Sequence, residues 1–256
     1  MKKIILTILT LFLFLINTVT DVEASQTSKE YKIAASDGFT LKAVLSYPKT
    51  KGQKEFKTVV LLHSLGYNST WWGDLPAKLA DKGYAVLTID LRGHGGSVYN
   101  KNLAKVSWKS LTKTAYAKYP SDVAEIIDYI KSENPKKSFF DDWAIVGCDI
   151  GASAGIIAAD KLKYKPDTIV MLSPIVQTKG LYIPVSIAQL DSVDFLSITG
   201  KNDPVSKSAQ DYLRKFAQAG FEEYECNANT TGIIMIKSDP ELTTVITQWI
   251  SGYLDQ

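Results

Sequence analysis

Five short apolar runs constrain the fold of this chain more than any other feature of its sequence. Each run is four to six residues long, and Gly, Asp or Pro bounds most of them. Such runs predict β-strands that are buried on both faces. Residues 40–47 instead alternate polar and apolar side chains, which is typical of a half-exposed strand. The five buried runs are residues 59–62, 84–89, 143–146, 169–172 and 195–199.

Helical patterns alternate with these runs. Val123, Ile126, Ile127 and Ile130 recur at helical spacing, and residues 242–250 carry a similar stripe. Strands that alternate with helices require right-handed crossovers, so they predict a three-layer α/β fold, with a mostly parallel sheet covered by helices on both faces. In such folds ligands bind beyond the carboxyl ends of the strands.

The first 24 residues have the pattern of a secretory signal peptide. Lys2 and Lys3 precede an apolar run over residues 4–16, and a polar stretch ends at Ala24. An uncleaved anchor is the alternative, but the run is shorter than the ~20 residues of a membrane span. We therefore expect cleavage after Ala24, a single domain over residues 25–256, no stable membrane span in the mature chain, and a secreted, periplasmic or cell-envelope location.

Composition and charge exclude several classes of protein. With 45% hydrophobic and 22% charged residues, the chain is neither disordered, coiled-coil nor collagen-like. A net charge of +2 argues against a nucleic-acid partner. Cys148 and Cys226 are the only cysteines, and we expect them to be free, buried thiols. We find no phosphate loop, dinucleotide motif or Cys/His cluster, so no cofactor and no metal are expected.

Four sequence motifs follow the predicted strands. They are His63-Ser64-Leu65-Gly66, the run from Asp90 to Ser97, the stretch from Gly147 to Gly151, and Asp203. Together, and in this order, they resemble the α/β-hydrolase superfamily over nearly the whole mature chain. Only about twenty residues separate Pro174 from Asp194. A large cap domain does not fit there, so the resemblance is to the lidless branch of dienelactone hydrolases and simple esterases.

The resemblance assigns roles to particular positions. Asp149 occupies the nucleophile position of the strand-to-helix elbow, and Asp203 matches the acid of the catalytic triad. The backbone N–H groups of Leu65 and Ile150 correspond to the oxyanion hole. The family's histidine aligns with Thr231. Residues expected to line the adjoining pocket are His63, Ser64, Trp71 and Cys148.

The chemistry departs from the family at two of these positions. Asp149 replaces the usual serine, and Thr231 cannot act as a general base. The chain has two histidines, His63 and His94, and both fall in loops early in the fold. Ser153 lies in a second, overlapping G-x-S-x-G string, but it falls about one turn inside the helix. The triad is therefore predicted to be degenerate.

Three functions are compatible with this pattern. The first is an exported hydrolase-like protein with catalysis lost or weakened, which keeps a pocket for a small ligand or a partner. The second is an active hydrolase of esters or related small substrates with Asp149 as nucleophile, as in haloalkane dehalogenases and epoxide hydrolases. The third is a structural or interaction protein of the cell envelope. Asp149 also has a structural role available, because Asp is a favourable helix N-cap.

Overall fold

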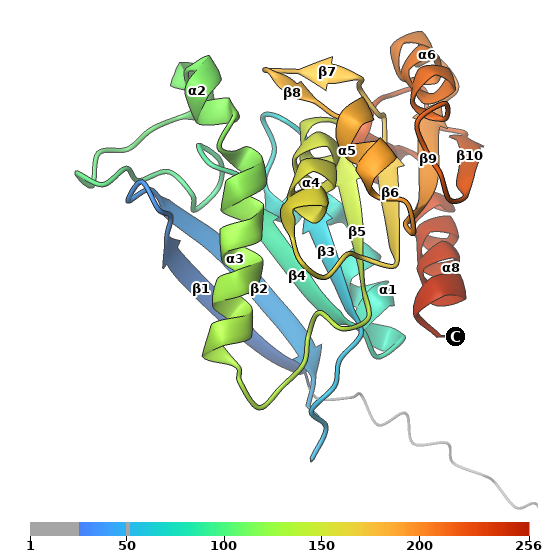
Figure 1. Ribbon diagram of the computed structural model, residues 1–256. Helices are drawn as coiled ribbons and strands as arrows, with labels where there is room; N and C mark the ends of the chain where they lie inside the picture. Colours follow the sequence, from blue (N-terminus) through green and yellow to red (C-terminus); the bar gives the residue numbers. More distant parts are fainter. Residues whose placement is uncertain (1–25, 50–51, 256) are drawn as a thin grey trace, which may run out of the picture.

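The computed structural model describes residues 26–49 and 52–255, and its centre is an eight-stranded sheet (Figure 1). The strand order is β1-β2-β4-β3-β5-β6-β9-β10. The strands are β1 (Gln26–Ala34), β2 (Thr40–Pro48), β3 (Thr58–Leu62), β4 (Ala85–Asp90), β5 (Trp143–Cys148), β6 (Thr168–Leu172), β9 (Asp194–Gly200) and β10 (Phe221–Cys226). A separate hairpin pairs β7 (Gln177–Thr178) with β8 (Leu181–Tyr182).

Helices cover both faces of the sheet. The eight α-helices are α1 (Leu75–Asp81), α2 (Lys113–Tyr116), α3 (Tyr119–Glu133), α4 (Ile150–Lys161), α5 (Pro184–Gln189), α6 (Pro204–Leu213), α7 (Met235–Ser238) and α8 (Leu242–Leu254) among the described residues. Three 3-10 turns are η1 (Ser69–Trp72), η2 (Trp108–Ser110) and η3 (Gly232–Ile234). The predicted α/β fold class is confirmed.

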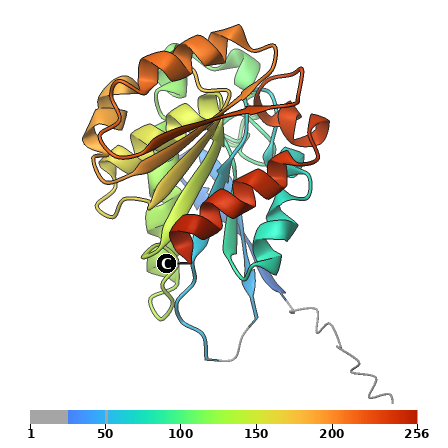
Figure 2. The same cartoon turned by 90° about the vertical axis from the view of Figure 1, so that its right-hand side faces the viewer.

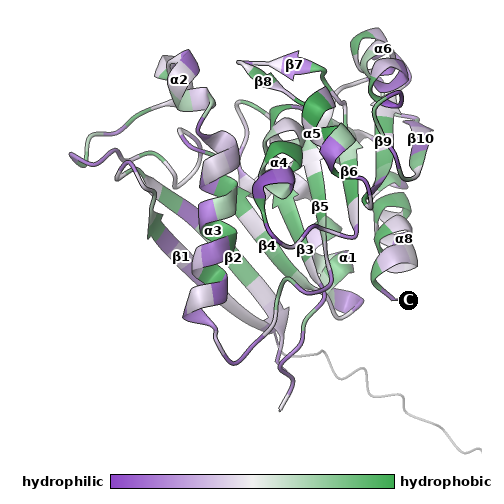
Figure 3. Cartoon of the chain, viewed as in Figure 1, coloured by the Kyte–Doolittle hydropathy of each residue, from purple (hydrophilic) through white to green (hydrophobic). Residues whose placement is uncertain are grey.

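Two cores form because successive strand residues point to opposite faces. In β3, Val60 and Leu62 pack with α3 and α4, whereas Val59 and Leu61 pack with α1 and α8. Figure 2 shows the sheet on edge, with helices on both of its faces. Hydrophobic residues accordingly concentrate in the central strands and in α4, and the outer faces of the helices are more polar (Figure 3). This is why the central strands read as uninterrupted apolar runs.

The direction of the strands decides at which edge of the sheet functional side chains can come together. β1 and β2 are antiparallel to their neighbours, and the six remaining strands of the sheet run parallel to one another. The register pairs Leu62 of β3 with Gly147 of β5, and Cys148 with Leu172 of β6. The carboxyl ends of these strands therefore meet at one edge of the sheet.

The five buried runs correspond to β3, β4, β5, β6 and β9, and residues 40–47 fall in β2. Between β6 and β9 the chain builds only β7, β8 and α5, so no large cap domain is inserted there. The predicted signal peptide, residues 1–24, lies outside the described residues. Within the described part of the chain, no helix is long and apolar enough to cross a membrane.

Candidate active site

Asp149 occupies a sharp turn between β5 and α4. Its backbone has φ +40° and ψ −109°, a conformation that residues with a side chain rarely adopt. The flanking glycines are required by close packing. A Cβ at Gly147 would lie 2.4 Å from Cα of Ala152, and one at Gly151 would lie 2.3 Å from the carbonyl oxygen of Leu62. The segment thus has the geometry of a nucleophile elbow, with an aspartate at its apex.

The carboxylate of Asp149 accepts hydrogen bonds from the two backbone amides assigned to the oxyanion hole. Its Oδ1 accepts from the N–H of Ile150 and, at 3.3 Å, from the N–H of Leu65. Burial raises the pKa of Asp149, while hydrogen bonds from Ser64 and from the two amides act in the opposite direction. The two amides that the resemblance assigns to an oxyanion hole are therefore occupied by the protein's own side chain.

The loop after β10 closes over this carboxylate. The N–H of Gly232 donates to Oγ of Ser173 at 2.8 Å, and the N–H of Ile233 donates to Oγ of Ser64 at 3.0 Å. Gly232 has φ +60°, and a Cβ there would lie only 3.2 Å from Oδ2 of Asp149. Thr231, aligned with the family's histidine, is exposed and makes no capping hydrogen bond. Backbone at Gly232, rather than the side chain of Thr231, faces the elbow.

Both histidine side chains form hydrogen bonds with backbone groups and do not face Asp149. Nε2 of His63 accepts from the N–H of Leu91 at 3.0 Å, and Nε2 of His94 accepts from the N–H of Gly66 at 2.9 Å. An acceptor nitrogen carries no proton, so the Nδ1–H group of each ring donates to nearby carbonyl oxygens. Burial lowers the pKa of His94 and lowers that of His63 to about 4. Neither ring is available as a general base.

Asp203 keeps the position of a triad acid without a partner for it. Its side chain caps α6, where Oδ1 accepts from the N–H of Ser206 at 3.0 Å. Its Oδ2 is buried and has no hydrogen-bond partner among the described residues. In a working triad this oxygen would accept from the imidazole. The unpartnered oxygen is what the loss of the histidine would leave behind.

The residues expected to line a pocket lie mostly in the interior. His63 and Cys148 are fully buried, and burial raises the pKa of the Cys148 thiol. Ser64 is also buried, with its hydroxyl beneath the loop after β10. Trp71 is partly exposed, with Nζ of Lys237 4.0 Å from its ring centre. Cys148 packs in one of the two cores, and the ring of His63 bonds backbone groups of Ser64 and Leu91; that these residues line a pocket stays a prediction.

Two further sequence expectations concern neighbouring residues. Ser153 is fully buried inside α4, with its hydroxyl on the carbonyl oxygen of Asp149, so it cannot serve as an exposed nucleophile. Cys148 and Cys226 are both free and buried, as expected.

Sequence reasoning had no signal for a surface cavity of about 570 Å³ at the opposite edge of the sheet. Its lining includes Lys57, Tyr84, Asp142 and Asp255.

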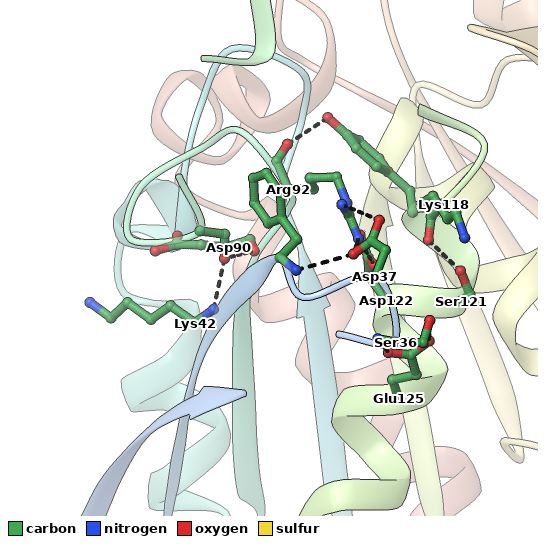
Figure 4. Close-up of polar contacts among 12 residues, drawn as sticks. Ser36, Asp37, Lys42, Asp90, Arg92, Lys118, Ser121, Asp122 and Glu125 are labelled. Carbon is green, nitrogen blue, oxygen red and sulfur yellow. Dashed lines mark hydrogen bonds and ion pairs between the residues drawn. The ribbon is translucent and has the colours of Figure 1, made fainter. Parts of the chain in front are cut away.

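The run from Asp90 to Ser97 is a structural support of the site. Arg92 forms ion pairs with Asp37 at 2.8 Å and with Asp122 of α3 at 2.6 Å, and Figure 4 shows its guanidinium between the two carboxylates. The carboxylate of Asp90 accepts from the N–H groups of Ser69 and Gly96. These bonds fix the loop after β4. That loop in turn positions His94 so that its ring accepts the N–H of Gly66, in the loop after β3.

An elbow of this geometry on a mostly parallel sheet defines the chain as an α/β-hydrolase-fold protein. Residues 53–193 match the Hydrolase_4 family, whose description is serine aminopeptidase, S33, and the chain belongs to this family. A serine hydrolase-like protein of Dictyostelium discoideum is 24% identical over 78% of the chain. The match covers 48% of that protein, so the chain spans about half its length.

Solved structures with this fold include two hydrolases. An esterase of Pyrococcus furiosus has a TM-score of 0.67 at 17% identity, with 89% of this chain and 91% of the esterase covered. Dienelactone hydrolase of Anabaena variabilis has a TM-score of 0.60 at 16% identity, with 88% and 96% covered. At this identity the likeness establishes the fold. The expected resemblance to dienelactone hydrolases and esterases is confirmed at that level.

Proposed function

We propose that this chain is a hydrolase-like protein that has lost the ester hydrolysis of its family and keeps the site as a binding or structural element. One observation carries the proposal: Oδ1 of Asp149 accepts the N–H groups of both Leu65 and Ile150. A substrate carbonyl would have to displace a buried, hydrogen-bonded side chain from the hole. Acyl transfer would also need a base, and both imidazoles are engaged with backbone.

Hydrolysis of short and medium acyl p-nitrophenyl esters tests this proposal. We expect the wild-type rate to equal that of buffer. Asp149→Ala should be as active as wild type or more active, because it frees both amides of the oxyanion hole. Triad-deleted hydrolases with an open hole retain roughly 10³–10⁴-fold catalysis over water. Asp203→Ala serves as the control, since it leaves the hole filled. Efficient turnover that Asp149→Ala abolishes would overturn the proposal.

A second candidate activity is alkyl transfer to Asp149. With Oδ1 held by two amides, the carboxylate is fixed in orientation, and an oxygen of a fixed carboxylate can displace a leaving group from an alkyl carbon. The resulting ester would persist, because no imidazole activates water beside it. Mass spectrometry after incubation with an alkyl halide or an epoxide tests this candidate, with Asp149→Asn as control. An adduct on Asp149 that is absent from the variant would favour it over the first proposal.

In this proposal the site beyond the carboxyl ends of the parallel strands still binds a small ligand or a partner. Trp71 is a partly exposed aromatic side chain there, and it contacts Tyr67 and Lys237. Its fluorescence should respond to a ligand, with Trp71→Phe as the control. A purely structural role at the cell envelope predicts no response to any ligand.

Export is the remaining part of the proposal. It is supported by the charged start, the apolar run over residues 4–16 and the small residue at Ala24. Sequencing the amino terminus of protein recovered from outside the cytoplasm should give Ser25 first. Recovery of an intact amino terminus at Met1 would contradict cleavage.

A further inference from the structure

The chain's positive charge is concentrated in one segment. Residues 91–121 contain five lysines and one arginine but no aspartate or glutamate, although the whole chain has a net charge of only +2. Arg92 is buried within its ion pairs. Four of the lysines are exposed: Lys101, Lys105, Lys109 and Lys113. The exposed surface of this segment is therefore cationic and lacks compensating acids from its own sequence.

A fifth exposed lysine joins these four from a different part of the fold. Nζ of Lys179, in the turn between β7 and β8, lies 5.2 Å from the ring centre of Tyr116 in α2. The same turn packs on Lys113, since a Cβ at Gly180 would lie 3.0 Å from its Cε. No ion pair involves any of these five lysines within the described ranges. We call Lys101, Lys105, Lys109, Lys113 and Lys179 the basic rim.

An apolar side chain stands at the tip of the same segment. Leu103 is 78% exposed and has φ +61°, a backbone conformation that glycine and asparagine adopt more readily. The turn is built by Asn100, whose Oδ1 accepts from the N–H groups of Asn102 and Ala104, both at 3.0 Å. Tyr99, at the base of the turn, is 44% exposed. A fixed turn thus presents a leucine to solvent between Lys101 and Lys105.

The tip and the rim project from the body of the molecule. Figure 1 shows the green segment between β4 and α3 extending away from the sheet, with α2 at the same end of the molecule as the β7–β8 hairpin. That end is the edge where the parallel strands finish. The segment can therefore approach a flat surface before the rest of the fold does.

We propose that the basic rim and Leu103 dock this protein on an anionic lipid bilayer. Lysines beside a negatively charged membrane each strengthen binding about fivefold. Leucine and tyrosine side chains gain further free energy by entering the boundary between headgroups and acyl chains. This inference does not depend on whether the elbow is catalytic.

The same features disfavour a soluble polyanion or a nucleic acid as the partner. Phosphate recognition favours the bidentate fork of arginine, and the one arginine of residues 91–121 is buried. An apolar tip gains nothing from a hydrated polymer, whereas it matches the interior of a bilayer. Lysines acting as point charges around a leucine fit a lipid surface best.

Co-sedimentation with lipid vesicles tests the proposal. The protein should begin at Ser25, so that the apolar run over residues 4–16 cannot bind the vesicles itself; residues 26–49 and 52–255 form the whole sheet and both cores. We expect binding to vesicles containing phosphatidylglycerol and none to pure phosphatidylcholine. Binding should fall steeply at 1 M salt, where screening reaches to about 3 Å.

Two matched pairs of variants localise the surface. Lys101→Glu with Lys105→Glu should weaken binding by at least about 25-fold. Lys136→Glu with Lys161→Glu makes the same change of charge at exposed lysines outside the rim, and its binding should change much less. Leu103→Ser should weaken binding about tenfold, whereas Tyr164→Ser, at a 52% exposed site beyond the carboxyl end of α4 and away from the rim, should not.

Three outcomes would overturn the proposal. Equal binding to neutral and anionic vesicles is the first, and equal losses in the rim and control variants is the second. The third is tight binding of soluble polyphosphate that is independent of Leu103, with no binding to vesicles, which would identify a polyanion partner instead. Circular dichroism of each variant confirms that a loss of binding is not a loss of fold.

Discussion

At the scale of single residues, Asp149 changes what the elbow can do. A serine there would leave the amides of Leu65 and Ile150 open to a substrate, whereas the longer aspartate reaches them itself. The same carboxylate lies at the amino terminus of α4, where the helix dipole favours a negative charge. The aspartate at this elbow is therefore a group whose hydrogen bonds are satisfied within the fold.

Substitutions of Asp203 test, by their effect on stability, whether its buried carboxylate oxygen lacks a partner. Its Oδ2 is buried and finds no hydrogen-bond partner in the described part of the chain, which costs about 1–3 kcal/mol. Asp203→Ser keeps an oxygen that can cap α6 and removes the unpartnered one, so we expect the free energy of unfolding to rise by about 1 kcal/mol. Asp203→Ala, which also loses the cap, should be less stable than the serine variant by about 1 kcal/mol. Urea unfolding measures both, and a less stable serine variant would contradict the assignment.

At the scale of elements, the crossing of β5, α4 and β3 leaves no space for a side chain at Gly147 or Gly151. The carbonyl oxygen of Leu62 lies where a Cβ of Gly151 would be. Backbone cannot yield as a flexible side chain does, so this contact fixes the approach of the helix to the sheet. The glycines of the G-x-nucleophile-x-G pattern thus have a steric function that survives the loss of the serine.

Two glycine substitutions test this packing. Gly151→Ala should destabilise the protein by about 3 kcal/mol, because the new methyl group meets backbone at 2.3 Å. Gly252→Ala is the matched control in α8, where nothing lies within 4 Å of the new Cβ. It should stabilise the protein by about 0.5–1 kcal/mol through helix propensity. Thermal unfolding would contradict the packing argument if the two variants were equally stable.

At the scale of the whole molecule, resistance to acid depends on a buried imidazole. The pKa of His63 is about 4, against an ordinary value of 6.5, because burial disfavours the charged form. The unfolded chain therefore binds this proton at a higher pH than the folded protein does. Stability from this group is complete above pH 6.5 and falls as the pH drops toward 4, by roughly 3 kcal/mol in total.

The free energy of unfolding at pH 7 and at pH 4.5 measures this loss. His63→Asn removes the titrating group, so its stability should change less than that of the wild type over the same interval. The variant starts from a lower stability, because the imidazole also bonds Leu91 and Ser64. If the variant lost as much free energy of unfolding between pH 7 and pH 4.5 as the wild type does, the acid sensitivity would belong to another group.

The sequence by itself determined the central layer of this protein. Strands buried on both faces must be apolar at every position, so the five runs were recognisable without tertiary information. β1 was not predicted, because it is an edge strand in which Tyr31, Ile33 and little else are buried. The order of the strand-end motifs indicated the family, which the family match confirms. The count of two histidines predicts an incomplete triad.

Only the tertiary structure decided which groups surround Asp149 at the elbow. That Asp149 reaches the amides of Leu65 and Ile150 depends on the distance between two loops 84 residues apart in sequence. The position that faces Asp149 is Gly232 rather than Thr231, because a positive φ and two hydrogen bonds to serine hydroxyls turn the backbone inward. Sequence patterns report which side chains are buried along an element, whereas contacts between loops are set by how the packed elements bring their ends together.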